Sequence, residues 1–169
     1  AAKDHYTAGP SLRVMNYALQ IAQALGLPKT DVDLLKQACL LHDIGKIGIP
    51  DGILNKKSAL SDKEREHIFR HPAAGKQILS SVADFQGILE IIQTHHERVD
   101  GKGYPHGLKR EDIPLLARIL SVADTYDAIC SERPYRKAKS KTQAIAELQT
   151  VKNKQLDEAI VDKFIEVLS

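Results

Sequence analysis

The sequence has no long uninterrupted apolar run, and no stretch approaches the roughly 18 residues that a membrane-spanning helix needs. Its start also lacks the basic segment followed by an apolar one that marks a secretory leader. Cysteine is scarce: Cys39 and Cys130 both stand among apolar neighbours, which is typical of reduced core residues rather than of a disulfide framework or a thiolate zinc site. We therefore expect no membrane span, no secretion, and action in a reducing cytoplasm.

A strong charge of one sign is lacking as well. The net charge is only +2, which argues against long-range attraction to duplex nucleic acid. Basic residues still gather locally at Arg133, Arg136, Lys137, Lys139 and Lys141, a cluster that suits either a small anion or a solvated surface turn. The length of 169 residues is typical of one domain, so we expect residues 1–169 to form a single unit.

The alternation of apolar and polar residues that marks a half-buried strand is absent throughout, and apolar residues recur with helical spacing instead. Thr30 with Asp33 resembles a helix-capping signal, and Ser61 with Glu64 is a better one. The pattern predicts an all-α fold. The expected helices span Ser11–Leu25, Thr30–Leu41, Ser61 to near His71, a short segment through Gly75 to Leu79, Ile88–Glu97, Pro114–Ile129, Thr142–Val151 and Leu156–Leu168.

Between two of these helices lies a long loop, residues 100–114, which is rich in glycine and proline. Loops of this length are uncommon in a compact domain unless they carry function. The loop is therefore a candidate part of a functional site.

Side chains that can bind metals occur at the ends of, or within, four separate expected helices. They are His42, Asp43, His71, His95, His96 and Asp124. Imidazole and carboxylate ligands suit iron, manganese, zinc or nickel, and a carboxylate can bridge two ions about 3.5–4 Å apart, an arrangement that hydrolyses phosphate esters. A lone histidine is more often a hydrogen-bonded core residue, but so many polar side chains beside apolar helices would be costly without an ion. The set predicts a metallohydrolase.

Other candidates have competing interpretations. His67 shares a helical face with His71, but its charged neighbours indicate that it faces solvent. His5 and His106 are expected to be exposed. Lys46 either reaches a phosphate beside the metals or interacts with the end of a helix.

The same residues form longer motifs. The stretch at residues 42–50 reads HDIGKIGIP, and the stretch at 95–105 reads HHERVDGKGYP. Together with His71-Pro72, residues 113–128 and residues 133–136, these motifs cover nearly the whole chain, which resembles the HD-GYP family, a branch of the HD metal-dependent phosphohydrolases. The resemblance implies a bundle of about seven helices with a GYP loop, and hydrolysis of cyclic di-GMP to pGpG or GMP in bacterial signalling in the cytoplasm.

The resemblance also implies roles for single residues. His42, Asp43, His71, His95, His96 and Asp124 would bind two divalent ions, iron or manganese, with nickel or zinc as alternatives. Asp43 would bridge the ions, and Lys46 would neutralise the scissile phosphate, so these two are the catalytic candidates. The substrate candidates are Lys46, Gly103, Tyr104, Pro105, Arg133 and Arg136, the two arginines holding the second phosphate or a guanine. Expected protein partners are a receiver or sensor domain in the full-length protein and a GGDEF-type protein.

The chain departs from the family pattern at two positions. Pro10 stands where family members commonly have a histidine, and Tyr6 stands where trinuclear members have a glutamate. These departures predict two ions rather than three, one of them short of a ligand that water or His5 would replace, and weakened activity. Two alternatives stay open: a cyclic dinucleotide sensor or docking module with little activity, and an HD phosphohydrolase for another nucleotide such as cyclic GMP-AMP.

Overall fold

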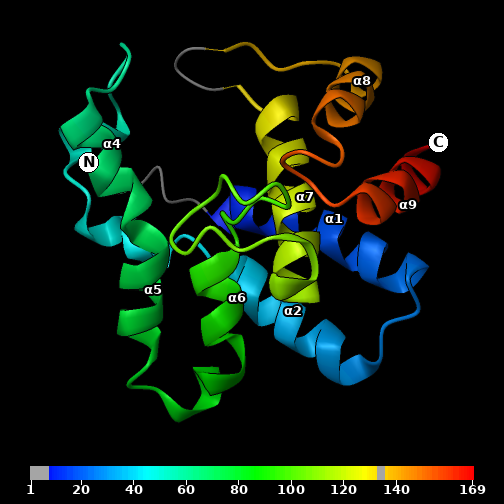
Figure 1. Cartoon of the computed structure of the whole chain (residues 1–169), viewed down its shortest axis with the longest axis horizontal. Coiled ribbons are helices and arrows are strands. Elements are labelled where there is room, and N and C mark those ends of the chain that lie inside the picture. Colours follow the sequence, from blue (N-terminus) through cyan, green and yellow to red (C-terminus); the bar gives the residue numbers. More distant parts are fainter. Residues whose placement is uncertain (1–7, 133–135) are drawn as a thin grey trace.

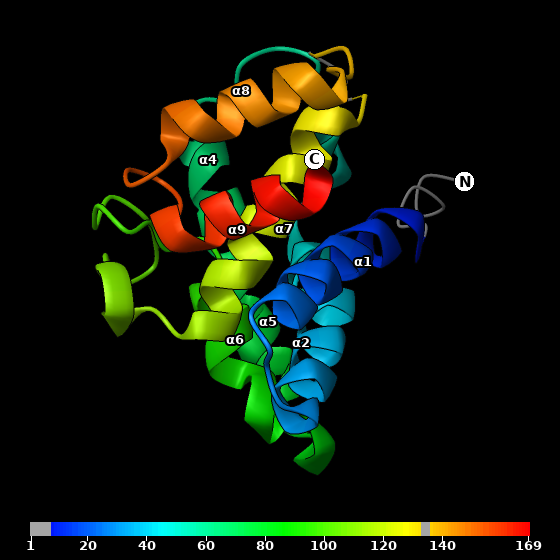
Figure 2. The same ribbon diagram turned by 90° about the vertical axis from the view of Figure 1, so that its right-hand side faces the viewer.

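The computed structural model describes residues 8–132 and 136–169, and these ranges are helical, so the all-α prediction is confirmed (Figures 1 and 2). Isolated β bridges join Asp100 to Lys109 and Lys152 to Leu156. The α-helices are α1 Ala8–Ala24, α2 Lys29–Leu41, α3 Asp51–Leu54, α4 Asp62–Phe69, α5 His71–Leu79, α6 Leu89–Thr94, α7 Leu115–Cys130, α8 Lys141–Val151 and α9 Glu158–Leu168. Short 3-10 helices are η2 Ile44–Gly48, η3 Ala83–Ile88 and η4 Arg110–Asp112.

Helix α7 runs through the middle of the molecule in both views (Figures 1 and 2). It packs against α1, α2, α6, α8 and α9. Because neighbours surround it, residues on most of its sides are buried, including Ile119, Leu120 and Val122. Burying such an aliphatic side chain contributes about 1.5–3 kcal/mol each, so this helix anchors the core and also fixes the position of Asp124.

Helix starts follow local capping chemistry, with one exception to the sequence prediction. The Ser61 capping box is confirmed: the Ser61 hydroxyl accepts from the Glu64 amide, and the Glu64 carboxylate accepts from the Ser61 amide. The cap predicted at Thr30 is wrong. Helix α2 begins earlier, with Pro28 as the capping residue, and the Pro28 carbonyl already accepts from the Val32 amide at 3.1 Å.

The segment before the histidine pair also differs from the prediction of one helix from Ile88 to Glu97. Residues 83–88 form the 3-10 helix η3, and α6 ends at Thr94. The chain turns there, and the carboxylate of Glu97, just beyond the turn, accepts hydrogen bonds from amides of the following loop. His95 and His96 therefore stand in the turn just beyond α6 rather than inside it.

Helices α4 and α5 meet at Arg70, so the predicted break near His71 is confirmed. His71 is the first residue of α5, with Pro72 in its first turn, where proline needs no amide partner. Gly45 of η2 packs on this start so closely that a Cβ there would lie 1.9 Å from the His71 carbonyl oxygen. Among the described residues, no helix combines the length and the apolarity that crossing a bilayer requires.

Candidate metal centre

Three buried histidines are held in the same way by the backbone of the preceding turn. Nδ1 of His42, His71 and His95 lies 2.7, 2.7 and 2.6 Å from the carbonyl oxygens of Cys39, Ile68 and Ile92. A carbonyl oxygen only accepts a hydrogen bond, so Nδ1 carries the proton in each ring. When such a ring is neutral, Nε2 keeps its lone pair, and this is the form in which histidine binds a metal.

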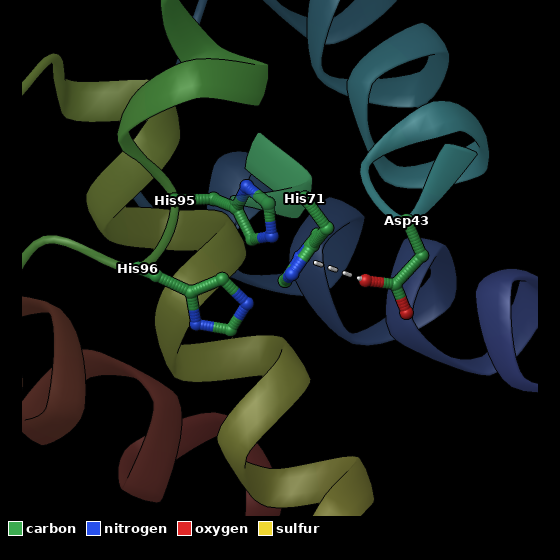
Figure 3. Close-up of side chains that lie close together, drawn as sticks. All are labelled: Asp43, His71, His95 and His96. Carbon is green, nitrogen blue, oxygen red and sulfur yellow. Dashed lines mark ion pairs between the residues drawn. The ribbon is translucent and has the colours of Figure 1, made fainter. Parts of the chain in front are cut away.

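The Nε2 atoms of these three histidines are all buried, and His71 and His95 belong to one cluster of potential metal ligands. Each of the three residues is at most 2% exposed, and each Nε2 is buried without a hydrogen-bond partner. Ligand atoms of His71, His95, His96 and Asp43 lie within 4.8 Å of one another (Figure 3). Buried polar atoms without partners are costly, and a cation among them would remove that cost. The donor set therefore fits a metal ion.

Asp43 connects this cluster to a second group of ligands. Its Oδ1 lies 3.4 Å from His71 Nε2, and its Oδ2 lies 3.5 Å from His42 Nε2. His42 Nε2 is in turn 3.6 Å from Oδ1 of Asp124 on α7. The two oxygens of Asp43 thus face different histidines, which is the placement expected of a bridging carboxylate.

The electrostatics of the site favour positive charge between the carboxylates. Burial by itself would lower the pKa of His42, but the carboxylates of Asp43 and Asp124 raise it to about 9. Burial would raise the pKa of Asp43, yet His42, His71 and Lys46 hold it well below its usual value. Burial and the neighbouring rings lower the pKa of His95, which stays neutral. The cluster therefore combines ionised carboxylates with at least one neutral imidazole, as a divalent cation requires.

The glycine-rich loop is folded against His96. The rings of His96 and Tyr104 stack with centroids 5.1 Å apart, and the Tyr104 amide donates to the His96 carbonyl. A Cβ at Gly103 would lie 2.4 Å from the Arg98 amide nitrogen and 2.6 Å from the His96 carbonyl oxygen. Pro105 follows through a cis peptide bond and is exposed. Two of the predicted substrate residues in this loop, Gly103 and Tyr104, thus lie directly against the cluster residue His96.

Glu97 is a structural residue of the site that the sequence analysis missed. Its side chain is buried, and its carboxylate accepts from the amides of His106 at 2.6 Å and Leu108 at 2.9 Å. Glu97 directly follows the histidine pair, and through these two hydrogen bonds it holds the part of the loop at residues 106–108. An acidic residue directly after an apolar helix and two histidines was the signal that could have revealed it.

Two basic residues stand beside the cluster. Lys46 Nζ donates to Asp43 Oδ2 at 2.8 Å. Arg136 lines a cavity of about 320 Å³ together with His95, His96 and Asp124. Its guanidinium donates to the Ala128 carbonyl and lies near Glu147. A phosphate in this cavity would lie between the cluster and a fixed positive charge.

The other sequence candidates lie elsewhere. His67 and His106 are exposed, as predicted, and Pro10 is exposed in the first turn of α1. Arg133, named as a substrate residue, lies outside the described residues, and so do His5 and Tyr6.

A helical fold that gathers buried histidines and two aspartates from three helix ends and from the middle of α7 defines the class of His/Asp metal-binding helical domains. Comparison with known proteins identifies the family within this class. The model of the HD domain family matches residues 1–160, and the chain belongs to this family.

Curated relatives agree with the HD-GYP resemblance. The chain is 41% identical over 155 residues to the cyclic di-GMP phosphodiesterase response regulator RpfG of Xanthomonas campestris, covering 90% of this chain and 41% of that protein. It is also 41% identical over 145 residues to the 3'3'-cGAMP-specific phosphodiesterase 3 of Vibrio cholerae, covering 86% of this chain and 32% of that protein. The chain therefore spans less than half the length of these relatives.

Solved structures share the fold. An HDG"Y"P protein from Bdellovibrio bacteriovorus superimposes with a TM-score of 0.77 at 24% identity, covering 94% of this chain and 51% of that chain. A cyclic GMP-AMP-specific phosphodiesterase from V. cholerae gives a TM-score of 0.73 at 20% identity, covering 94% and 43%. At these identities the matches show the fold alone.

Proposed function

We propose that this domain is a metal-dependent phosphodiesterase that hydrolyses cyclic di-GMP to pGpG or GMP. One observation carries the proposal: three buried histidines, each fixed through Nδ1, have Nε2 atoms that lack a hydrogen-bond partner and lie beside the carboxylates of Asp43 and Asp124. A packed core has no use for such a set without a cation. The names of the curated relatives supply the substrate class.

The ligand geometry supports two ions that share Asp43. Asp43, His71, His95 and His96 would hold one ion, and His42, Asp43 and Asp124 would hold the other. The second group has fewer ligands, in line with Pro10 standing where relatives of this type have a histidine. We propose iron or manganese because the donors are imidazole and carboxylate. When bound, such ions polarise a phosphoryl oxygen and lower the pKa of water.

The chain's own residues would bind and orient the substrate. Lys46, held by Asp43, places an ammonium group beside the cluster, where it would offset charge on the scissile phosphate. Arg136, fixed by the Ala128 carbonyl, would bind the second phosphate or a guanine from the adjoining cavity. Tyr104 would close the pocket against His96.

The wider setting is also a proposal. Because the relatives extend well beyond the matched segment, we propose that this single domain is coupled to a receiver or sensor domain and works with a GGDEF-type protein in the cytoplasm. The two free cysteines, Cys39 and Cys130, agree with a reducing compartment.

The test is product analysis. Protein loaded anaerobically with manganese or iron is incubated with cyclic di-GMP, and pGpG and GMP are followed by chromatography. We expect His71→Gln to abolish product, because it removes a cluster ligand, and the matched His67→Gln, on exposed α4 surface one turn earlier, to retain it. Binding of cyclic di-GMP without product in the metal-loaded protein would favour a sensor.

Cyclic GMP-AMP is a second candidate substrate, because the V. cholerae relative specific for it is as similar as RpfG. The ratio of kcat/KM for the two cyclic dinucleotides separates these candidates. A higher kcat/KM for cyclic GMP-AMP would show that cyclic GMP-AMP, and not cyclic di-GMP, is the preferred substrate.

A further inference from the structure

Three aromatic rings lead from the metal cluster to the protein surface. His96, in the cluster, stacks on Tyr104 with an angle of 16° between the ring planes. Tyr104 in turn lies 4.5 Å from Phe69, ring centroid to ring centroid, with an angle of 33°. Phe69 is the last residue of α4 and is 46% exposed. The run therefore ends in an aromatic ring that is open to solvent.

The position of Phe69, rather than its exposure, is the informative feature. Single exposed apolar residues are ordinary on protein surfaces. The surrounding surface of α4 is polar, with Arg65, Glu66 and His67 all exposed. Phe69 stands two residues before His71, so the same short segment supplies a cluster histidine and a free aromatic face.

We propose that Phe69 stacks against a purine base of the phosphodiester whose phosphate is held at the cluster; this inference rests on the proposed function and adds a substrate contact to it. The Phe69 ring lies no farther from His96 than the two ring-to-ring steps of 5.1 and 4.5 Å together. Phe69 is therefore close enough to the cluster for one base of a dinucleotide to lie beside it while a phosphate is held at the cluster. The ring would bind any purine by its π face, so it would favour nucleotide diesters over small ones without selecting guanine.

The test compares two substitutions at Phe69. Phe69→Leu keeps an apolar cover over Tyr104 but has no π face, whereas Phe69→Tyr keeps the ring. Loss of one base–aromatic stack predicts that Phe69→Leu raises KM for cyclic di-GMP by about 5- to 150-fold, the equivalent of about 1–3 kcal/mol, with kcat nearly unchanged. Phe69→Tyr should stay within about twofold of the wild type. Ile78→Leu, at an exposed apolar position on α5, is the matched control.

A base-free diester, methyl p-nitrophenyl phosphate, separates stacking from structural support. Its kcat/KM should be the same in the wild type and Phe69→Leu, and an equal loss on both substrates would overturn the proposal because it would indicate a displaced cluster. An unchanged KM for cyclic di-GMP would overturn it as well.

Calorimetric Kd values for cyclic di-GMP keep this inference distinct from the proposed hydrolysis. If the metal-loaded wild type cleaves nothing, the catalytic proposal fails, but a Kd that rises in Phe69→Leu and not in Phe69→Tyr still supports stacking. A Kd equal in all variants, or no binding by the wild type, overturns the role of Phe69.

Discussion

At the scale of single residues, the histidines of the site are oriented by the hydrogen bond that each ring makes through Nδ1, the nitrogen that faces away from the cluster. The repeated contact from Nδ1 to the carbonyl three residues earlier orients His42, His71 and His95 by their own local backbone. Only the convergence of the Nε2 atoms depends on the tertiary fold. The ligands are therefore preorganised, and little conformational freedom is lost when a cation binds.

Substitution of Gly103 tests how tightly the glycine-rich loop packs against the backbone around the histidine pair. In Gly103→Ala, the new Cβ would meet backbone atoms of His96, Glu97 and Arg98, the nearest at 2.4 Å. Because backbone cannot move aside cheaply, we expect a loss of about 1–3 kcal/mol in the free energy of unfolding and lower metal affinity. Urea denaturation and metal titration measure these effects. Gly52→Ala is the control, since nothing lies within 4 Å of its Cβ position, and equal behaviour of the two variants would contradict the packing argument.

Asp100 gives a pH-dependent contribution to stability. The hydrogen bonds from Arg98 lower the pKa of Asp100 to about 2, helped by the Lys102 amide. A carboxyl group whose pKa is lowered by folding stabilises the folded state at pH values above its unfolded pKa, which is about 3.9 for aspartate. This contribution is lost as the pH falls toward 2. The Tm of the wild type should exceed that of Asp100→Asn at pH 6, and the gap should shrink toward pH 2.5. The control is Asp84→Asn, at an exposed position. A Tm difference between the wild type and Asp100→Asn that stays the same from pH 6 to pH 2.5 would contradict this role of Asp100.

At the scale of elements, the loop after the histidine pair is stabilised from two sides. Glu97 binds the amides of His106 and Leu108, and Gly101 and Gly107 adopt positive φ angles of 79° and 67°, which glycine tolerates best. The loop therefore holds one shape without regular secondary structure. That shape places Tyr104 against His96.

Replacing Glu97 with glutamine tests this account of the loop. The amide group of Glu97→Gln can accept only one of the two hydrogen bonds, and its NH₂ would face the other donor. We expect a loss of about 1–3 kcal/mol in the free energy of unfolding and faster amide exchange in residues 100–109. Hydrogen exchange followed by mass spectrometry measures the second effect. Exchange unchanged from the wild type, or an equal change in exposed Glu111→Gln, would show that Glu97 does not fix the loop.

The sequence predicted those features that depend on local patterns. Apolar spacing located α1, α7 and α9, and the Ser61 capping box marked the start of α4. The pattern failed where tertiary contacts decide. No local pattern predicted that α2 begins at Lys29, that α6 ends at Thr94, or that Glu97 binds the amides of the following loop.

Contacts between distant residues were likewise beyond the sequence. Arg13 on α1 forms an ion pair with the buried Asp127 on α7, Nε to Oδ1 at 2.7 Å, across more than a hundred residues. The local pattern does not pair these two residues, because they lie on separate helices far apart in the sequence. The run from Tyr104 to Phe69 is of the same kind, because a loop and a helix end meet only in the folded chain.

At the scale of the whole molecule, one core positions ligands from separated segments. Helix α7 fixes Asp124, the turn after α2 supplies His42 and Asp43, α5 begins with His71, and the turn after α6 supplies His95 and His96. These elements pack mainly through their apolar faces, and their polar ligand residues meet at one place. Stability and metal binding are therefore coupled, since a cation that binds only the folded state stabilises it.

Anomalous X-ray diffraction from manganese-loaded crystals tests the central claim most directly. The account predicts one anomalous peak among Asp43, His71, His95 and His96, and a second among His42, Asp43 and Asp124, with Asp43 contacting both. Absence of a peak at these side chains in fully loaded crystals, or peaks bound only by other residues, would contradict it.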